Sequence, residues 1–285
     1  MRTAIGRESA QIAEVPCITV TSPNTAVNWG RGSTQQIKWS HNLGSRSSVR
    51  IELSRDGGLT FPEVLAADLK NSASSSGLFN WQVTGPNTTQ AIVRVTWTAG
   101  PTADVSNLAF TIADPYITAT SPSSPSTSWG YGSTQRVKWQ TNLGPWDTVS
   151  VLLSTDGGST FPTTLASSAV ASAPLADVPV PALAAPTAAA RARVVWNNAP
   201  TGQTAAGTTP VNFRVEGNWV TVTLPNGGET WVIGTTATVK WSSNMGSTAR
   251  FNIYLSTDDG ASYPNVIAAN TLNDGSRSSR CRPPG

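Results

Sequence analysis

The feature that most constrains the fold of this chain is an internal repeat. Three segments carry the same motifs in the same order, and they open at Ile18, Ile117 and Val220. The period is therefore about 100 residues, which is the size of one immunoglobulin-type sandwich and too long for a solenoid repeat or a propeller blade. A chain built in this way is expected to fold as a row of similar domains.

Each copy contains a strand pattern around a tryptophan, in which an apolar residue, a lysine and a tryptophan follow one another. This pattern stands at residues 37–39, 137–139 and 239–241. Because side chains alternate between the two faces of a strand, the apolar residue and the tryptophan share one face while the lysine points to water. We expect Trp39, Trp139 and Trp241 to fill the core between two sheets.

The composition favours short strands over helices. Only 12% of the residues are charged, and strand-favouring Val, Ile, Thr and Trp recur in short bursts between turn residues. We predict an all-β chain of tandem immunoglobulin-like or fibronectin-III-like β-sandwiches, with about seven strands in each complete copy. The predicted domains are an irregular segment at 1–16, β-sandwiches at 17–115 and 116–217, and an incomplete β-sandwich at 218–285.

The third copy is predicted to be incomplete. Where the first copy approaches its strand at Trp81, the third reads SRSSRCRPPG from residue 276, without alternation of apolar and polar residues. The copy would then lack its last two or three strands and expose unpaired edges and half a core. We expect it to be a fragment, or the frame-shifted end, of a longer gene product and to be only marginally folded.

One motif in each copy invites a functional interpretation but predicts a turn. The pattern Ser-x-Asp-x-Gly-x-x-aromatic matches the Asp-box of sialidases and begins at Ser54, Ser154 and Ser256. In such a hairpin the aspartate accepts hydrogen bonds from turn amides, glycine adopts positive φ and the aromatic ring packs beneath. A calcium site at Asp258 and Asp259 is disfavoured, because the first two copies have glycine in place of the second aspartate.

Residue types needed for other chemistry are scarce. The single histidine, His41, excludes a multi-histidine zinc site, and we expect it to be exposed in a loop. Cys17 and Cys281 have no counterparts in other copies, and two free thiols are favoured over a bond between them. No Gly-x-Ser-x-Gly elbow or phosphate loop occurs. The sequence therefore predicts no catalytic residues, no cofactor and no metal.

Charge and hydropathy restrict the partners. The net charge of +3 arises from scattered arginines without a basic run, so no nucleic-acid partner is expected. No segment approaches the roughly 20 apolar residues needed to span a membrane, so membrane insertion is not expected. Residues 1–16 lack the apolar core of a signal peptide.

The motifs together resemble a known extracellular family. Thr-x-Ser-Pro, Trp followed by Gly, (Ile/Val)-Lys-Trp and a strand ending in Leu-Ser-x-Asp-Gly-Gly are similar to the Ser/Thr-rich, immunoglobulin-like module of yeast cell-wall synthesis proteins of the KRE/KNH type. Such modules also occur in tandem in bacterial secreted and surface proteins. The resemblance implies an extracellular or cell-surface location and supplies no catalytic residues. The second copy departs from this family pattern at Val178, where the first copy has Trp81. The resemblance therefore does not predict how that strand packs.

Two functions are compatible with the sequence. The first is a non-catalytic structural or adhesive module, a spacer or stalk, whose partners are neighbouring domains of a longer parent protein. Short linkers at residues 113–116 and 216–219 favour it. The second is an accessory module of a larger secreted enzyme that binds cell-wall or extracellular polysaccharide, because exposed aromatic rings stack on sugars. The candidate stacking residues are Trp29, Trp129, Trp146 and Trp231.

Overall fold

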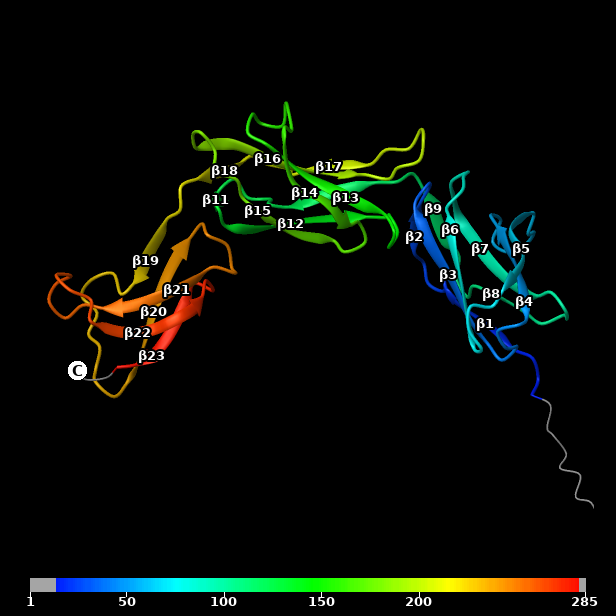
Figure 1. Cartoon of the computed structure of the whole chain (residues 1–285), viewed down its shortest axis with the longest axis horizontal. Helices are drawn as coiled ribbons and strands as arrows, with labels where there is room; N and C mark the ends of the chain where they lie inside the picture. The colour runs from blue at the N-terminus through cyan, green and yellow to red at the C-terminus, as the bar shows by residue number, and fades with distance from the viewer. Residues whose placement is uncertain (1–13, 282–285) are drawn as a thin grey trace, which may run out of the picture. The chain divides into compact units, whose positions relative to one another are not determined.

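The computed structural model describes residues 14–281, and every regular element in that range is a β-strand (Figure 1). The predicted all-β class is therefore confirmed. Most of the predicted irregular segment 1–16, and residues 282–285 of the third copy, lie outside the described residues. The strands form three groups, at residues 18–113, 117–216 and 220–280, which we call the first, second and third repeats.

The first repeat is a sandwich of two sheets. Its strands are β1 (Ile18–Ser22), β2 (Asn28–Gly30), β3 (Thr34–His41), β4 (Ser48–Ser54), β5 (Glu63–Lys70), β6 (Ser76–Gln82), β7 (Thr88–Trp97), β8 (Ala103–Val105) and β9 (Phe110–Ala113). One sheet has the order β1-β3-β6 and the other β2-β9-β7-β4-β5, with β8 paired to β7. Strand β2 runs parallel to β9, and the other pairs are antiparallel. Two such sheets around one core make an immunoglobulin-type sandwich.

The second repeat has the same topology. Its strands are β10 (Ile117–Ser121), β11 (Ser128–Gly130), β12 (Thr134–Thr141), β13 (Thr148–Ser154), β14 (Thr163–Val170), β15 (Leu175–Pro179), β16 (Thr187–Trp196), β17 (Ala206–Thr208) and β18 (Phe213–Glu216). The sheets are β10-β12-β15 and β11-β18-β16-β13-β14, with β17 on β16. The three-residue strands raise the strand number above the predicted seven. Val178 takes the ladder position of Trp81 and is fully buried.

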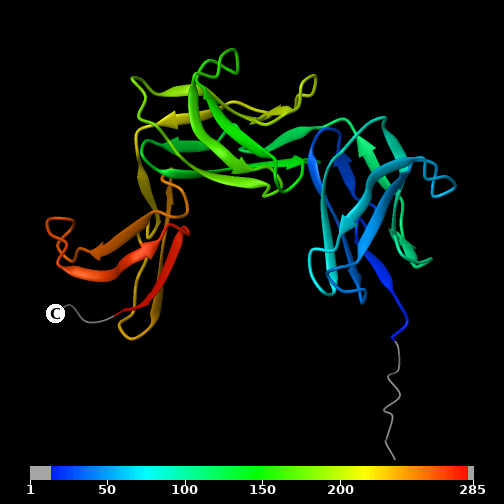
Figure 2. The same ribbon diagram turned by 45° about the vertical axis from the view of Figure 1, so that its right-hand side comes forward.

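The third repeat has one complete sheet and part of a second. Its strands are β19 (Val220–Leu224), β20 (Thr236–Ser243), β21 (Arg250–Leu255), β22 (Asn265–Leu272) and β23 (Ser276–Arg280). They form the sheets β19-β20-β23 and β21-β22. Within residues 220–281 no strand takes the places of β2, β7, β8 and β9. The shorter strand set is drawn from yellow to red in Figure 2.

The polar stretch at residues 276–280 forms strand β23, so the prediction that it has no strand structure is wrong. It pairs with β20 from Lys240 opposite Ser276 to Thr236 opposite Arg280. The ladder is made by main-chain amides and carbonyls, and side chains determine only which face can be buried. Because β23 lies at a sheet edge with mostly exposed side chains, it needs no apolar alternation.

A buried tryptophan lies in the core of each repeat, as the alternation predicts. Trp39, Trp139 and Trp241 are all buried, and each indole N–H donates one hydrogen bond. The acceptors are Asn71 Oδ1, the Ala171 carbonyl and Asn273 Oδ1, at 3.0, 2.8 and 2.9 Å. A partner for the only polar atom of the ring removes the penalty of burying it unpaired.

Contacts divide the described chain into two compact units. The first holds the first repeat together with the loop Asn142–Trp146, and the second holds the remainder of the second repeat and the third repeat. The loop belongs to the second repeat in sequence, since it joins β12 to β13. The domain limits 17–115, 116–217 and 218–285 remain predictions.

Candidate functional site

The Ser-x-Asp turns have the predicted hydrogen-bonding geometry. In the first repeat the Asp56 carboxylate accepts hydrogen bonds from the Thr60 amide at 2.9 Å, the Thr60 hydroxyl at 2.6 Å and the Ser54 hydroxyl at 2.6 Å. The two glycines that follow the aspartate have φ of 75° and 91°. The same contacts recur around Asp156 and Asp258. These carboxylates stabilise a turn.

Hydrogen bonding also lowers the pKa of these aspartates. Bonds from Ser54 and Thr60 lower the pKa of Asp56 from its ordinary value of 3.8 to about 2. The equivalent serine hydroxyls lower the pKa of Asp258 to about 2, and the pKa of Asp156 is lowered as well. Such a carboxylate stays ionised at neutral pH, so the turns supply no general acid.

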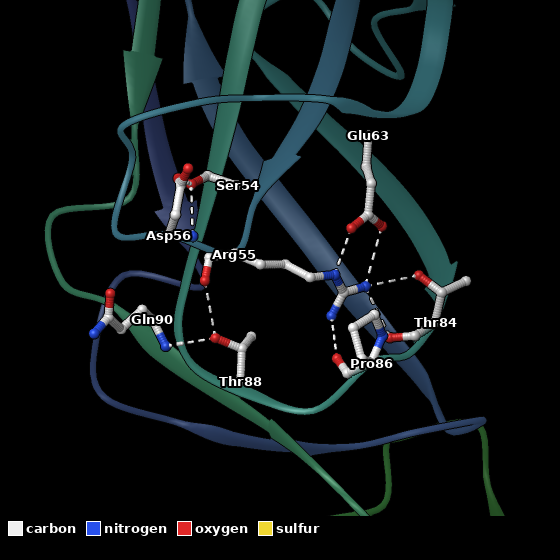
Figure 3. A network of polar contacts seen from close by, with 8 residues as sticks. All are labelled: Ser54, Arg55, Asp56, Glu63, Thr84, Pro86, Thr88 and Gln90. Carbon is white, nitrogen blue, oxygen red and sulfur yellow. Dashed lines mark hydrogen bonds and ion pairs between the residues drawn. The ribbon is translucent and has the colours of Figure 1, made fainter.

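In the first repeat Arg55 connects the turn to the loop that precedes β7 (Figure 3). Its guanidinium binds both carboxylate oxygens of Glu63 and donates to the carbonyls of Thr84 and Pro86. Its own carbonyl accepts a hydrogen bond from the Thr88 hydroxyl at 3.0 Å. The arginine is therefore committed to protein acceptors that hold the turn against this loop.

Two of the four candidate stacking tryptophans are buried. Trp29 and Trp129 are 7% and 2% exposed, and their rings pack on Phe110 and Phe213 with centroids 4.9 and 4.4 Å apart. They lie in β2 and β11, which pair in parallel with β9 and β18. Neither ring offers a face to a sugar. This corrects the expectation for these two residues, which form part of the core.

The other two candidates are more accessible. Trp146 is 57% exposed, and its indole N–H donates to Asn80 Oδ1 at 3.3 Å. Trp231 is half-buried and lines a groove of the third repeat. The counterparts of Trp146 are Arg46 and Thr248, so a stacking surface at this loop would be particular to the second repeat.

A buried asparagine in the loop after β20 connects three segments of the second compact unit. The Asn244 side chain accepts from the Trp219 amide at 3.0 Å and donates to the Gly217 carbonyl at 2.9 Å. Its main-chain carbonyl accepts from the Gly130 amide and from the Gln135 side chain, both at 2.8 Å. Asn244 thus holds the linker of its own repeat and the end of β11 in the preceding repeat.

Asn142 makes an equivalent set of bonds in the first compact unit. Its side chain donates to the Asp114 carbonyl at 3.0 Å, and its carbonyl accepts from the Gly30 amide at 2.8 Å and from the Gln35 side chain at 3.2 Å. A Cβ at Gly30 would lie 2.7 Å from Asn142 Oδ1. Glycine is therefore required for this close approach.

We call the asparagine with its linker contacts the linker clamp, and the glycine and glutamine that meet it the receiving site. The linker clamps are at Asn42, Asn142 and Asn244, and the receiving sites are Gly30 with Gln35 and Gly130 with Gln135. Asn42 also binds its own linker, through the Cys17 amide and the Val15 carbonyl, both at 2.8 Å. The third repeat has Val232 and Ala237 at the receiving positions.

Asn-x-Gly recurs at residues 42–44, 142–144 and 244–246, but the sequence alone gave it no role. Two features of the sequence could have indicated the site. An asparagine recurs in the same loop of every repeat, and the glycine and glutamine of the receiving site are replaced in the third repeat. The interaction itself joins residues more than 100 positions apart. Such a distance cannot be read from a local pattern.

His41 is buried rather than exposed in a loop. It is the last residue of β3, two positions after Trp39, so it faces the same side of the strand. Its Nδ1 accepts a hydrogen bond from the Leu43 amide at 3.2 Å.

Cys17 and Cys281 are free thiols.

Residues 14–281 contain no group of three or more His, Cys, Asp and Glu side chains placed to hold a metal ion. In the same range there is no helix long and apolar enough to cross a membrane.

The strand order identifies the chain as tandem immunoglobulin-like β-sandwiches. No protein-family model matches it, and no curated protein matches it. Similar solved structures include fibronectin(III)-like modules of Clostridium thermocellum CbhA, with 15% identity over 70% of this chain and 92% of that chain and a TM-score of 0.22. The three N-terminal domains of the bacteriophage RB49 Highly Immunogenic Outer Capsid protein (Hoc) share 10% identity over 94% and 88%, with a TM-score of 0.31. The FN1–FN3 domains of chicken CNTN1 share 12% identity over 94% and 88%, with a TM-score of 0.25. Likeness at this level carries no functional argument.

Proposed function

We propose that this chain is a non-catalytic spacer or stalk of an extracellular or cell-surface protein, with adhesive contacts made through its neighbours. The observation that carries the proposal is the linker clamp, which recurs at one loop position and, at Asn142 and Asn244, binds both an incoming linker and a receiving site. The proposed domains, 17–115, 116–217 and 218–285, each follow one sequence repeat.

The bonds at the linker clamp are buried and directional. Asn244 uses its side-chain oxygen and nitrogen on its own linker, and its carbonyl accepts from the receiving site. Each bond of this kind contributes about 1 kcal/mol net, and leaving a buried partner unpaired costs more. Bonds on both sides of one residue resist bending about linker residues 217–219, which is the property that a spacer needs.

The proposed location and partners rest on the sequence. The low charge content and the motifs that resemble the KRE/KNH-type cell-wall module support an extracellular or cell-surface place. The proposed partners are neighbouring domains of a longer protein, because the repeated loops bind adjacent parts of the same chain.

A distance measurement across the linker clamp tests the spacer function. Spin labels are placed at Ser159 and Ala261, which are exposed turn residues of the second and third repeats. The full chain is used, with both native cysteines changed to serine. We expect Asn244→Ala to broaden the distribution of distances between the labels without unfolding either repeat.

The matched control is Asn42→Ala, which removes a linker clamp at the equivalent loop of the first repeat, remote in sequence from both labels. We expect it to leave the label distribution unchanged. If the Asn244→Ala distribution is as narrow as that of the unmutated chain, the hydrogen bonds do not restrain the linker and the spacer proposal is wrong.

A second candidate function, binding of cell-wall or extracellular polysaccharide as an accessory module, is favoured by the exposed Trp146. The full chain is screened on insoluble polysaccharides and a glycan array. Leu59→Ala is the control, because Leu59 is an exposed apolar residue of the first repeat. Binding that is lost in Trp146→Ala and kept in Leu59→Ala would support this function. No binding to any glycan by the unmutated chain would contradict it.

A further inference from the structure

Trp146 lies against the outer face of the β1-β3-β6 sheet, within the first compact unit. Its indole N–H donates to Asn80 Oδ1 at 3.3 Å, and the Gln36 side-chain nitrogen donates to the same oxygen at 3.2 Å. Gln36 and Asn80 lie directly opposite each other in the β3–β6 ladder. We call these three side chains, an aromatic ring beside two amides, the Trp-amide cluster.

The loop that carries Trp146 is held closely against β3. A Cβ at Gly144 would lie 1.8 Å from the Thr34 carbonyl oxygen, so glycine is needed for this approach. Asn142, at the start of the loop, makes the linker-clamp bonds. The ring is therefore oriented before any ligand arrives, although Trp146 remains 57% exposed. A side chain that is ordered in advance loses little conformational entropy on binding.

The indole also determines which amide atoms are available to a ligand. An indole N–H can only donate, so the atom of Asn80 that it meets is the oxygen. That oxygen in turn requires the side-chain nitrogen of Gln36 on its other side. Among residues 14–281 no hydrogen bond is made by Asn80 Nδ2 or by Gln36 Oε1. The cluster thus offers one donor group and one acceptor beside the ring.

The sheet that carries the cluster has little charge. Strands β1, β3 and β6 contain no aspartate or glutamate, and Lys38 is their only lysine or arginine. Lys38 lies opposite Leu78, in the next outward pair of the ladder. This pair is about 7 Å along the strands from the two amides. Such a face favours an uncharged ligand rich in hydroxyl groups, because a hydroxyl both donates and accepts hydrogen bonds.

The equivalent positions of the other repeats are built differently. In the second repeat Arg136 and Asp177 form a two-bonded ion pair at 2.7 and 2.8 Å, which occupies both carboxylate oxygens. In the third repeat the hydroxyls of Thr238 and Ser278 bond to each other at 2.9 Å. The next loop in the chain has Thr248 in place of the tryptophan. Within the part of the chain that the structure describes, ring and amide pair therefore occur together once.

We propose that the Trp-amide cluster binds one unit of an uncharged polysaccharide. The C–H face of a pyranose ring stacks on Trp146. One sugar hydroxyl accepts a hydrogen bond from Asn80 Nδ2, and a neighbouring hydroxyl donates to Gln36 Oε1. The aromatic ring supplies contact area, and the amides fix the orientation of the sugar. This inference rests on the second candidate function, to which it adds the class of sugar and the residues that orient it.

The test uses the full chain and soluble hexasaccharides of cellulose, laminarin, mannan and chitin, which are uncharged, and of polygalacturonate, which is acidic. Titration calorimetry measures the dissociation constant of each. We expect saturable binding of at least one uncharged hexasaccharide, and weaker or no binding of the acidic one.

Two variants separate the amides from the ring. Asn80→Asp keeps the oxygen that faces the indole and removes the amide donor, so we expect the dissociation constant to rise roughly tenfold. Trp146→Phe keeps an aromatic ring and removes the N–H that orients the amides, so we expect a rise of about threefold. Ser278→Asp is the matched control, because it adds the same charge at the equivalent position of the third repeat. We expect it to leave the dissociation constant unchanged.

The outcomes distinguish this inference from the function on which it rests. If binding is lost in Trp146→Ala but unchanged in Asn80→Asp and Trp146→Phe, the amides do not orient the sugar. The inference is then wrong, while the second candidate function stands. If no uncharged hexasaccharide binds, or only the acidic one does, the inference is also wrong. The glycan array then decides separately on the second candidate function.

Discussion

Strands β1 and β19 carry the same motif and pair with equivalent partners, yet their surroundings differ. Val20 lies opposite Trp39 and is fully buried, whereas Val222 lies opposite Trp241 and is 53% exposed. In the first repeat β8 covers β1, and Asp104 Oδ2 accepts a hydrogen bond from the Val20 amide at 2.7 Å. Local sequence thus determines how a strand pairs, but its burial depends on a strand far along the chain.

The largest effect we expect from this difference is in the order of proteolytic cleavage. Burying one valine contributes roughly 1.5 kcal/mol or more. The valines of β19 are exposed and lack this contribution, and the apolar residues of β21 are only half-buried. We expect a thermolysin time course to cut residues 220–281 well before residues 18–216. Equal resistance of the first and third repeats to cleavage would contradict the conclusion that the exposed strands make the third repeat less stable.

Removal of the central tryptophan should affect the repeats unequally. Trp39→Ala is expected to lower the free energy of unfolding of the first repeat by about 3–5 kcal/mol, since it opens a cavity in a closed core. Trp241→Ala should cost less, because one side of its core is already open. Denaturant titration measures the loss of unfolding free energy in each variant, and hydrogen exchange shows which repeat has lost it. Equal losses would mean that the third core is closed in solution.

The glycine opposite the central tryptophan offers a finer comparison. A Cβ at Gly77 would lie 1.9 Å from the ring of Trp39, whereas the nearest atom to a Cβ at Gly275 is the Trp241 carbonyl oxygen at 3.5 Å. We expect Gly77→Ala to cost about 1–3 kcal/mol by overpacking. Gly275→Ala should cost about 1 kcal/mol, because φ is 85° there. Thermal unfolding measures both, and the reverse order would contradict the packing around Trp39.

Acid should weaken the Ser-x-Asp turn in a defined window. The pKa of Asp56 is about 2 in the folded chain against an ordinary 3.8, so the unfolded chain binds more protons as the pH falls. The contribution of this carboxylate to the free energy of unfolding is present above pH 3.8 and is lost as the pH falls toward 2. In Asp56→Asn we expect the melting temperature to decrease less over this pH range than in the unmutated chain. Asp68→Asn, at an exposed position of β5, is the control and should leave the fall unchanged.

The smallest effect is expected at the exposed strand of the third repeat. Val222→Thr should change the free energy of unfolding by less than about 0.5 kcal/mol, as for other exposed positions. Val20→Thr should cost about 1–3 kcal/mol, because its hydroxyl would be buried without a partner. Urea titration of both variants checks this. A similar loss at the two positions would show that another chain covers β19.

The parts of the structure that follow from local alternation could be predicted from the sequence. The face of β3 that carries Trp39 is an example, because the period of a strand fixes which residues point inward. The burial of Trp29 could not be predicted, since it depends on pairing with β9, more than 80 residues away. β23 was missed because an edge strand is held by main-chain bonds. Asn244 was missed as a site because its partners lie in another repeat.

The linker clamp and the receiving site also bear on how such an array lengthens over evolution. The second repeat carries both halves of the contact, the linker clamp at Asn142 and the receiving site at Gly130 with Gln135. A gene duplication that copies this whole segment reproduces the contact without any new mutation. The third repeat, with Val232 and Ala237 at the receiving positions, keeps only the linker clamp. Each clamp that meets a receiving site therefore binds the repeat that precedes it in the chain. Replacement of Gly130 alone would uncouple two neighbours while both cores stay intact.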